Sequence, residues 1–162
     1  MQGFLQFTLM LDDRDRKLLA LLQDDADTPL AVLAEAVSLS PSACSRRVLH
    51  LREAGTIARR VVLLDRARIN LPTTVFAMVK TAQHSVAWLE KFRAALADID
   101  EIVEVHRLTG QYDYILKIVL PNVERYDIIY KRLVGRIELF DVSASISMET
   151  MKAETALPTR YA

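Results

Sequence analysis

The sequence predicts an α+β protein with a helical N-terminal domain and a βαββαβ C-terminal domain. Two short helices with marked ends, joined by a tight turn, occupy residues 28–55. From residue 73 onward the pattern changes to strand, helix, strand, strand, helix, strand. The first pattern is typical of a helix-turn-helix, and the second of a ferredoxin-like sheet with both helices on one face.

The 162 residues carry a formal net charge of zero, so the chain as a whole shows no bias toward nucleic acid. Any such surface must come from local segregation of charge. Residues 12–35 contain seven acidic and three basic side chains, whereas residues 40–60 contain five arginines and one acid. The second segment is therefore the candidate for contact with a polyanion.

Cys44 is the lone cysteine, which excludes an intramolecular disulfide, and its helix position favours the core over a redox role. The sequence has no signal-peptide pattern and no apolar run near the roughly 18 residues of a membrane span. We therefore expect a cytoplasmic protein with no membrane partner. The three histidines fall in separate elements, and no phosphate loop or nucleophile motif occurs, so we predict no metal, cofactor or enzymatic activity.

The expected domain boundaries follow these changes of pattern. The segments are an N-terminal extension (1–10), a winged helix-turn-helix domain (11–65), a linker (66–72), a ferredoxin-like domain (73–150) and a C-terminal tail (151–162). Met10 is an alternative start for the chain. Within the linker, Asn70 suits a left-handed turn.

The first helix is predicted to begin at Asp12 or Asp13 and to end at Gln23, with leucines facing the core. The second is predicted to have Thr28 as its N-cap and Pro29 at its first position. Together with the third helix they form a small three-helix core.

The third helix has the clearest limits. Ser40 is a capping hydroxyl, Pro41 suits the first helical position, and Gly55 suits a left-handed exit. At about 100° per residue, one side of the helix is apolar and packs, while the other side offers hydroxyls and a guanidinium. We predict that bases or nearby phosphates of double-stranded DNA contact Ser42, Ser45, Arg46 and His50. Arg47 is predicted to contact the DNA backbone at the flank.

A β-prone run, residues 56–65, follows this helix and is predicted to form the wing. Arg59 and Arg60 would then lie near phosphates and add affinity that does not depend on sequence. Two alternatives stay open: an ordinary helical hairpin with a solvated arginine face, and a solvated strand edge for these two arginines.

Four strands, two helices and one hairpin turn make up the predicted C-terminal domain. They are a strand over 73–80, a helix capped by Ser85, a strand over 102–109, a hairpin turn at Gly110-Gln111, a return strand over 112–120, a helix starting at Pro121-Asn122 and ending at Gly135, and a strand over 139–148. The return strand is apolar on both faces. Because the predicted helices cover one sheet face, a second copy of the chain is expected to cover the other, which implies a homodimer.

Beyond these patterns, the chain resembles the leucine-responsive regulatory protein (Lrp/AsnC, feast/famine) family. The resemblance rests on motifs spread over residues 11–158. They are Leu11-Asp12-x-x-Asp15-Arg16-x-Leu18, Leu33-Ala34-Glu35, Leu39-Ser40-x-Ser42-x-Cys44-x-Arg46-Arg47-Val48-x-x-Leu51-x-x-x-Gly55-x-Ile57, Thr109-Gly110-x-Tyr112-Asp113-Tyr114-x-Leu116-Lys117 and Met148-Glu149-x-x-Lys152. The resemblance implies a transcription regulator whose dimers assemble into octamers or related states.

The resemblance also implies a small effector, usually an amino acid, bound beside the glycine turn. The residues it assigns to that site are Leu108, Thr109, Gly110, Tyr112 and Asp113. Free N–H groups at a glycine turn suit a carboxylate, and Asp113 suits an ammonium group. The alternative is that Asp113 is merely hydrated at the hairpin end.

Several positions depart from the family pattern. Gln111 replaces a frequent Asp, Val142 and Ala144 replace a Thr-x-Thr, and Leu49 stands where a basic residue is frequent. Operator and effector therefore do not carry over from relatives. Two rival functions remain: an architectural DNA-binding protein with little sequence preference, and an enzyme built around His106, Tyr112 and Asp113.

Overall fold

The computed structural model describes residues 10–162, which fall into two compact units. One unit holds the chain up to Val62 together with Lys152–Ala162, and the other holds Leu63–Met151. The backbone therefore passes between the units twice. The expected extension over residues 1–10 lies, except for Met10, outside the described residues.

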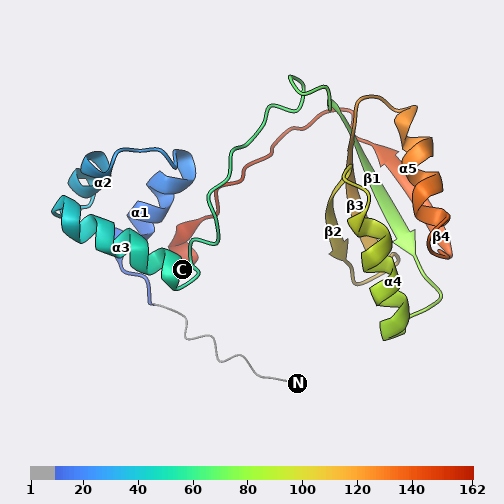
Figure 1. The fold of residues 1–162 in the computed structure, drawn as a ribbon, viewed down its shortest axis with the longest axis horizontal. Helices are drawn as coiled ribbons and strands as arrows, with labels where there is room; N and C mark the ends of the chain where they lie inside the picture. Colours follow the sequence, from blue (N-terminus) through green and yellow to red (C-terminus); the bar gives the residue numbers. More distant parts are fainter. Residues whose placement is uncertain (1–9) are drawn as a thin grey trace. The chain divides into compact units, whose positions relative to one another are not determined.

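The first unit contains three helices, α1 (Asp13–Asp24), α2 (Leu30–Ala36) and α3 (Pro41–Glu53) (Figure 1). A capping box starts α1, in which the Asp12 side chain accepts a hydrogen bond from the Asp15 backbone and the Asp15 side chain accepts one from Asp12. The core between the helices is formed by Leu18, Leu33, Ala34, Val37, Cys44 and Val48. The predicted three-helix core and the burial of Cys44 are confirmed.

The start of α2 differs from the prediction. Pro29 is the N-cap and no side chain caps the helix, whereas the Thr28 hydroxyl donates to the Asp25 carbonyl at 2.8 Å. The Thr28 hydroxyl is used in the loop after α1 instead, because the Asp25 carbonyl, three residues earlier, lies within hydrogen-bonding distance.

The predicted wing strand is also wrong. No strand occurs between α3 and residue 73, and no backbone-to-backbone hydrogen bond involves residues 58–64 in the described part of the chain. Val61, Val62, Leu63 and Leu64 are each more than half exposed. Branched residues favour a strand, but a strand also needs a neighbouring edge to pair with, and this segment has none within residues 10–162.

The C-terminal segment returns to the first unit, which the sequence did not reveal. The Gln23 side-chain amide accepts a hydrogen bond from the Leu157 N–H at 2.7 Å and donates one to the Leu157 carbonyl at 3.1 Å. Arg16 Nε donates to the Ala162 carbonyl at 2.8 Å, next to a short 3₁₀ helix, η1 (Thr159–Tyr161). The tail is therefore attached to α1 through Leu157 and Ala162.

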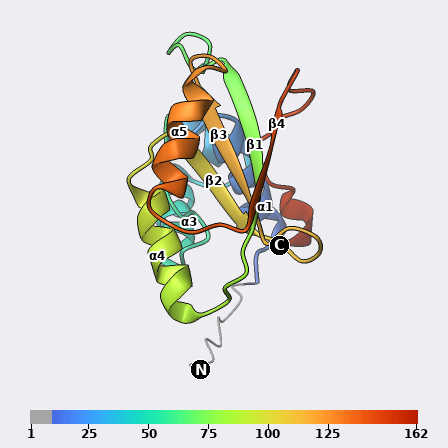
Figure 2. The same ribbon diagram turned by 90° about the vertical axis from the view of Figure 1, so that its right-hand side faces the viewer.

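The second unit is a four-stranded antiparallel sheet with two helices. Its elements are β1 (Thr73–Lys80), α4 (Val86–Ala97), β2 (Ile102–Arg107), β3 (Tyr114–Leu120), α5 (Arg125–Val134) and β4 (Asp141–Ile146). The strand order is β2-β3-β1-β4, and both helices lie on the same side of the sheet (Figure 2). The predicted ferredoxin-like arrangement is confirmed.

The core of this unit fills the space between the helices and one sheet face. Val75, Ala77 and Val79 of β1 alternate toward it. Trp88 and Phe92 of α4 pack with Tyr114 of β3, with ring centroids 4.8–5.9 Å apart. The Ser85 hydroxyl accepts a hydrogen bond from the Trp88 N–H at 3.1 Å, which confirms the predicted cap of α4.

Between β2 and β3 the turn is longer than predicted. Arg107 pairs with Tyr114, so residues 108–113 form a loop rather than a two-residue turn at Gly110-Gln111. Gly110 has φ +121°, and the Asp113 N–H donates to the Val79 carbonyl at 2.9 Å. The Asp113 carbonyl accepts a hydrogen bond from the Leu108 N–H at 2.7 Å, so the backbone of Asp113 links the hairpin to β1.

One predicted backbone conformation is confirmed, and two element boundaries differ from the prediction. Asn70 has φ +60°, as predicted for the linker. Helix α5 begins at Arg125, three residues later than expected, with the Asn122 side chain accepting from the Arg125 N–H at 3.1 Å. Strand β4 ends at Ile146 rather than residue 148, and its predicted alternation is weak because β4 is an edge strand.

Candidate nucleic-acid and effector sites

Helix α3 presents one buried and one exposed side. The Ser40 hydroxyl accepts from the Ala43 N–H at 3.3 Å, Pro41 occupies the first turn, and Gly55 leaves the helix at φ +76°. Cys44, Val48 and Leu51 fix the buried side. The opposite side is exposed, and we call it the exposed face of α3: it contains Ser42, Ser45, Arg46, Leu49, His50, Arg52 and Glu53. Capping and packing hold this face rigid, so its side chains need no ordering of the helix before they bind.

Two consecutive arginines of α3 have different surroundings. Arg46 is exposed and forms no ion pair within residues 10–162. Arg47 Nη1 lies 2.8 Å from Asp12 Oδ2 and 2.8 Å from Asp15 Oδ1, and hydrogen bonds to these carboxylates, the one to Asp15 most strongly, raise the pKa of the Arg47 guanidinium. Arg47 therefore ties α3 to the start of α1, a geometry that does not support its predicted role as a DNA contact.

The two arginines that follow α3 also differ. Arg59 is exposed and has no ion pair in the part of the chain that the structure describes. Arg60 forms an ion pair with Asp27 at 2.5 Å, and its guanidinium also donates to the Ala26 carbonyl. In the present geometry the charge of Arg60 is therefore directed toward the α1–α2 loop.

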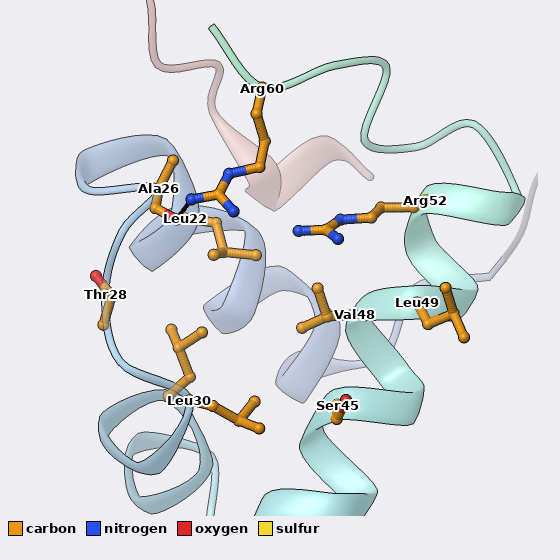
Figure 3. Close-up of a pocket in the computed structure, with 10 residues that line it drawn as sticks. Leu22, Ala26, Thr28, Leu30, Ser45, Val48, Leu49, Arg52 and Arg60 are labelled. Atoms are coloured by element: carbon orange, nitrogen blue, oxygen red, sulfur yellow. Dashed lines mark hydrogen bonds between the residues drawn. The ribbon is translucent and has the colours of Figure 1, made fainter. Parts of the chain in front are cut away.

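Arg52 is a basic residue that the sequence reasoning missed. It lines a pocket of about 300 Å³ on the first unit together with Arg60, above an apolar floor that includes Leu22 and Val48. Figure 3 shows the Arg52 side chain extending toward this pocket, whereas the Arg60 guanidinium turns toward Ala26. At 100° per residue, Arg52 lies within about 20° of Ser45, a spacing that could have identified it.

The second candidate site is the predicted effector site at the loop over residues 108–113, where Asp113 contacts the end of β1. Its carboxylate Oδ2 accepts a hydrogen bond from the backbone N–H of Thr81 at 2.8 Å, just after the end of β1. Asp113 thus joins the loop over residues 108–113 to β1, a structural contact that neither sequence-based alternative included. The second carboxylate oxygen has no protein partner among residues 10–162 and is free for a ligand.

The same end of β1 supplies a cation that the sequence did not suggest. Lys80 Nζ lies 5.2 Å from the centroid of the Tyr112 ring, within the range of a cation–π contact. The structure therefore brings together Lys80, Tyr112 and Asp113. Leu108, Thr109 and Gly110 lie in the same loop and are exposed. An ammonium group, a carboxylate and an aromatic ring in one place suit a small zwitterion.

Among residues 10–162, no group of three or more His, Cys, Asp and Glu side chains is placed to hold a metal ion. His106 lies on β2 beside Glu104, with its Nε2 3.4 Å from Glu104 Oε2. No helix in these residues has the length and apolar character needed to cross a membrane.

Comparison with known proteins decides the family. Residues 11–58 match the winged helix-turn-helix DNA-binding model, and residues 74–157 match the Lrp/AsnC ligand binding domain. The chain belongs to the Lrp/AsnC family. It is therefore a DNA-binding transcriptional regulator with a ligand-binding domain, in a family of non-enzymatic proteins, as predicted.

Individual members of the Lrp/AsnC family resemble the chain over nearly its whole length. The regulator Zrp of Zymomonas mobilis is 59% identical over 94% of this chain and 99% of its own. An AsnC family regulator of Agrobacterium tumefaciens has a crystal structure with a TM-score of 0.90 and 42% identity, covering 93% of this chain and 99% of its own. A Neisseria meningitidis regulator, solved as a complex with L-Met, has a TM-score of 0.87 and 28% identity, covering 93% and 98%.

Proposed function

We propose that this regulator binds specific DNA sequences by inserting α3 into the major groove. The observation that carries the proposal is the exposed face of α3, where Ser42, Ser45, Arg46 and His50 are accessible and Arg46 has no competing carboxylate within residues 10–162. A free guanidinium can donate two parallel hydrogen bonds to guanine, which discriminates by about 1–3 kcal/mol against the wrong base.

Arg52 and Arg59 complete the proposed interface as phosphate contacts. Arg52 is an exposed basic residue in the last turn of α3, Arg59 is an exposed basic residue in the segment after it, and each phosphate neutralised releases bound counterions. We leave Arg47 and Arg60 out of the interface, because both already pair with carboxylates of α1 or the loop that follows it.

Selection from a randomised duplex library, followed by fluorescence anisotropy on the enriched duplex, tests this proposal. Arg46→Ala should weaken binding to that duplex by about 5- to 150-fold, the range that 1–3 kcal/mol corresponds to. The matched control is Arg93→Ala on α4, also exposed and unpaired within residues 10–162. Equal affinity for enriched and random duplexes at physiological salt would instead indicate an architectural protein.

We also infer that an amino acid binds beside the loop over residues 108–113. Lys80 Nζ and the N–H groups around Gly110 suit its carboxylate, and the unused oxygen of Asp113 suits its ammonium group. The L-Met complex of the Neisseria meningitidis relative supports this class of ligand. An effector regulates DNA binding to the extent that it prefers one state of the protein over another.

A thermal-shift screen with the twenty amino acids tests the effector proposal, because a ligand at 100 times its Kd stabilises the native state by about 2.7 kcal/mol. Asp113→Asn keeps an oxygen to accept from the Thr81 N–H but removes the negative charge. It should melt at the wild-type temperature and lose the ligand-induced shift. A shift that survives in this variant would contradict the pairing of Asp113 with the ammonium group.

We propose further that the chain is a homodimer through the sheet face opposite α4 and α5, assembling to an octamer in the cytoplasm. Phe76, Met78 and Ile115 are half-buried on that face. Lys117, which lies opposite Phe76 in the sheet, pairs with Glu104 of β2 at 2.6 Å. Burial of this face by a second copy would remove apolar area from water.

Light scattering after size exclusion measures the assembly directly. Met78→Asp should shift the mass toward the monomer, because a second copy would bury the new charge unpaired. Val86→Asp is the control, since Val86 is 75% exposed and lies on α4, away from that face. A wild-type monomer at micromolar concentration would exclude the dimer.

A further inference from the structure

One leucine of α3 takes no part in the protein core. Leu49 is 52% exposed, whereas Cys44, Val48 and Leu51, on the buried side of the helix, are at most 9% exposed. Leu49 also belongs to neither hydrophobic cluster of the first unit, although Leu21 and Leu22 pack against one of them. Packing therefore does not explain the leucine at this position.

The position of Leu49 on the helix is informative. Single exposed leucines are common on protein surfaces and by themselves mean little. At about 100° per residue, however, Leu49 lies between Ser45 on one side and Ser42 and Arg46 on the other. In Figure 3, Val48 points toward Leu22 while Leu49 points away from it. Leu49 is thus the apolar centre of the exposed face that is proposed to enter the groove.

The chemistry of the major groove restricts what can lie against this side chain. A leucine offers neither a hydrogen-bond donor nor an acceptor, so a buried amino or carbonyl group of a base opposite it would lose its water without a replacement partner. Thymine differs from the other bases because it presents a 5-methyl group in this groove. Contact between the thymine methyl group and a leucine side chain removes apolar surface of both groups from water.

We propose that Leu49 reads a thymine methyl group, so that each operator half-site contains a required thymine. This proposal rests on the proposed binding of specific DNA by α3. Leu49 follows Arg46 by three residues, about 4.5 Å along the helix axis, and base pairs are spaced about 3.4 Å apart. The thymine should therefore lie one or two base pairs from the base that Arg46 contacts.

Replacing thymine by uracil tests the proposal, because the two bases differ only in the 5-methyl group and pair identically. Each dT of the duplex enriched by the wild-type protein is replaced by dU, one position at a time. At one position per half-site, affinity should fall about fourfold, the effect expected for one buried methyl-sized group. Substitution in both half-sites should multiply to about 15-fold for a dimer.

Variants of the same protein assign the effect to Leu49. Leu49→Ala should bind the dT and dU duplexes with affinities within about 1.5-fold, whereas Leu49→Met, which keeps a long apolar side chain, should retain the preference. Arg46→Ala should bind more weakly but keep the uracil penalty, because it leaves Leu49 in place. A 5-methylcytosine at the same position, paired with guanine, distinguishes recognition of the methyl group alone from recognition of a T·A pair.

The outcomes separate this proposal from the one on which it rests. If no duplex is enriched by the wild-type protein, both fail. If a duplex is enriched but every uracil substitution changes affinity by less than twofold, or if Leu49→Ala keeps the uracil penalty, specific binding stands and the role of Leu49 is refuted.

Discussion

The two neighbouring arginines of α3 should separate stability from DNA binding. Arg47 links two carboxylates at 2.8 Å each, and the side chains of Asp15, Arg47 and Asp12 are 10, 29 and 51% exposed. Arg47→Met keeps the apolar stem and removes the guanidinium, which leaves the nearly buried carboxylate of Asp15 without its cation. Arg46→Met makes the same chemical change at a neighbouring exposed position with no ion pair in residues 10–162.

The expected loss lies between two limits. Breaking an exposed ion pair removes about 0–1 kcal/mol, and removing one partner of a buried pair removes about 3–5 kcal/mol. Because Asp15 is nearly buried while its partner is partly exposed, we expect Arg47→Met to destabilise the first unit by about 2 kcal/mol. For a unit of this size that lowers the melting temperature by about 10 °C. Arg46→Met should change stability by less than about 0.5 kcal/mol.

Calorimetry of the full chain measures the melting temperature of the first unit, and anisotropy with the enriched duplex, well below that temperature, measures binding. Arg47→Met should bind nearly normally, and Arg46→Met should bind poorly while melting normally. If Arg47→Met melts at the wild-type temperature and loses binding, Arg47 is a DNA contact and the reasoning from its ion pairs is refuted.

Three further outcomes follow from the first unit. Hydrogen bonding from the Asp15 N–H, and then from Arg47, lowers the pKa of Asp12. The ionised Asp12 should therefore stabilise the fold above the unfolded pKa of about 3.9, and this stabilisation should disappear as the pH falls through the lower folded pKa. In calorimetry, Asp12→Asn should lose less stability than the wild type as the pH is lowered. Burial raises the pKa of the Cys44 thiol, so an aromatic disulfide reagent should react with it far more slowly in the native protein than in denaturant. Removal of Leu157–Ala162 should lower the stability of the first unit by about 1–2 kcal/mol, and Gln23→Ala by about half as much; an unchanged melting temperature would mean that the tail contributes nothing.

Much of the fold was predictable because its determinants are local. The Ser40 cap, Pro41 and Gly55 act within one helical turn, so the limits of α3 can be derived from the sequence. The same holds for the Ser85 cap of α4 and for the bounds of β1. Helical periodicity likewise separated the buried side of α3 from the exposed side, which is why most of the candidate DNA contacts are exposed.

The contacts that the sequence did not reveal are those in which a residue's partner is distant in the sequence. Arg47 and its carboxylates are 32 and 35 residues apart, and both Asp113–Thr81 and Lys80–Tyr112 are separated by 32 residues. Helical periodicity places Arg46 and Arg47 about 100° apart on α3, but it does not show that Arg47 faces two carboxylates. The wing segment failed for a related reason, because its branched residues favour a strand but pairing depends on an edge supplied by another part of the protein.

The sequence alone therefore determined the helices, the four strands of the sheet, their order and the outward side of α3, since capping, periodicity and turn chemistry act over about four residues. Only the tertiary structure decided which charges remain free to bind. Docking of α3 on α1 neutralised Arg47 and left Arg46 exposed, and docking of the 108–113 loop on β1 gave Asp113 a backbone partner. A charge already paired within the fold must break that pair before it can bind a ligand, and this pairing is set by long-range packing.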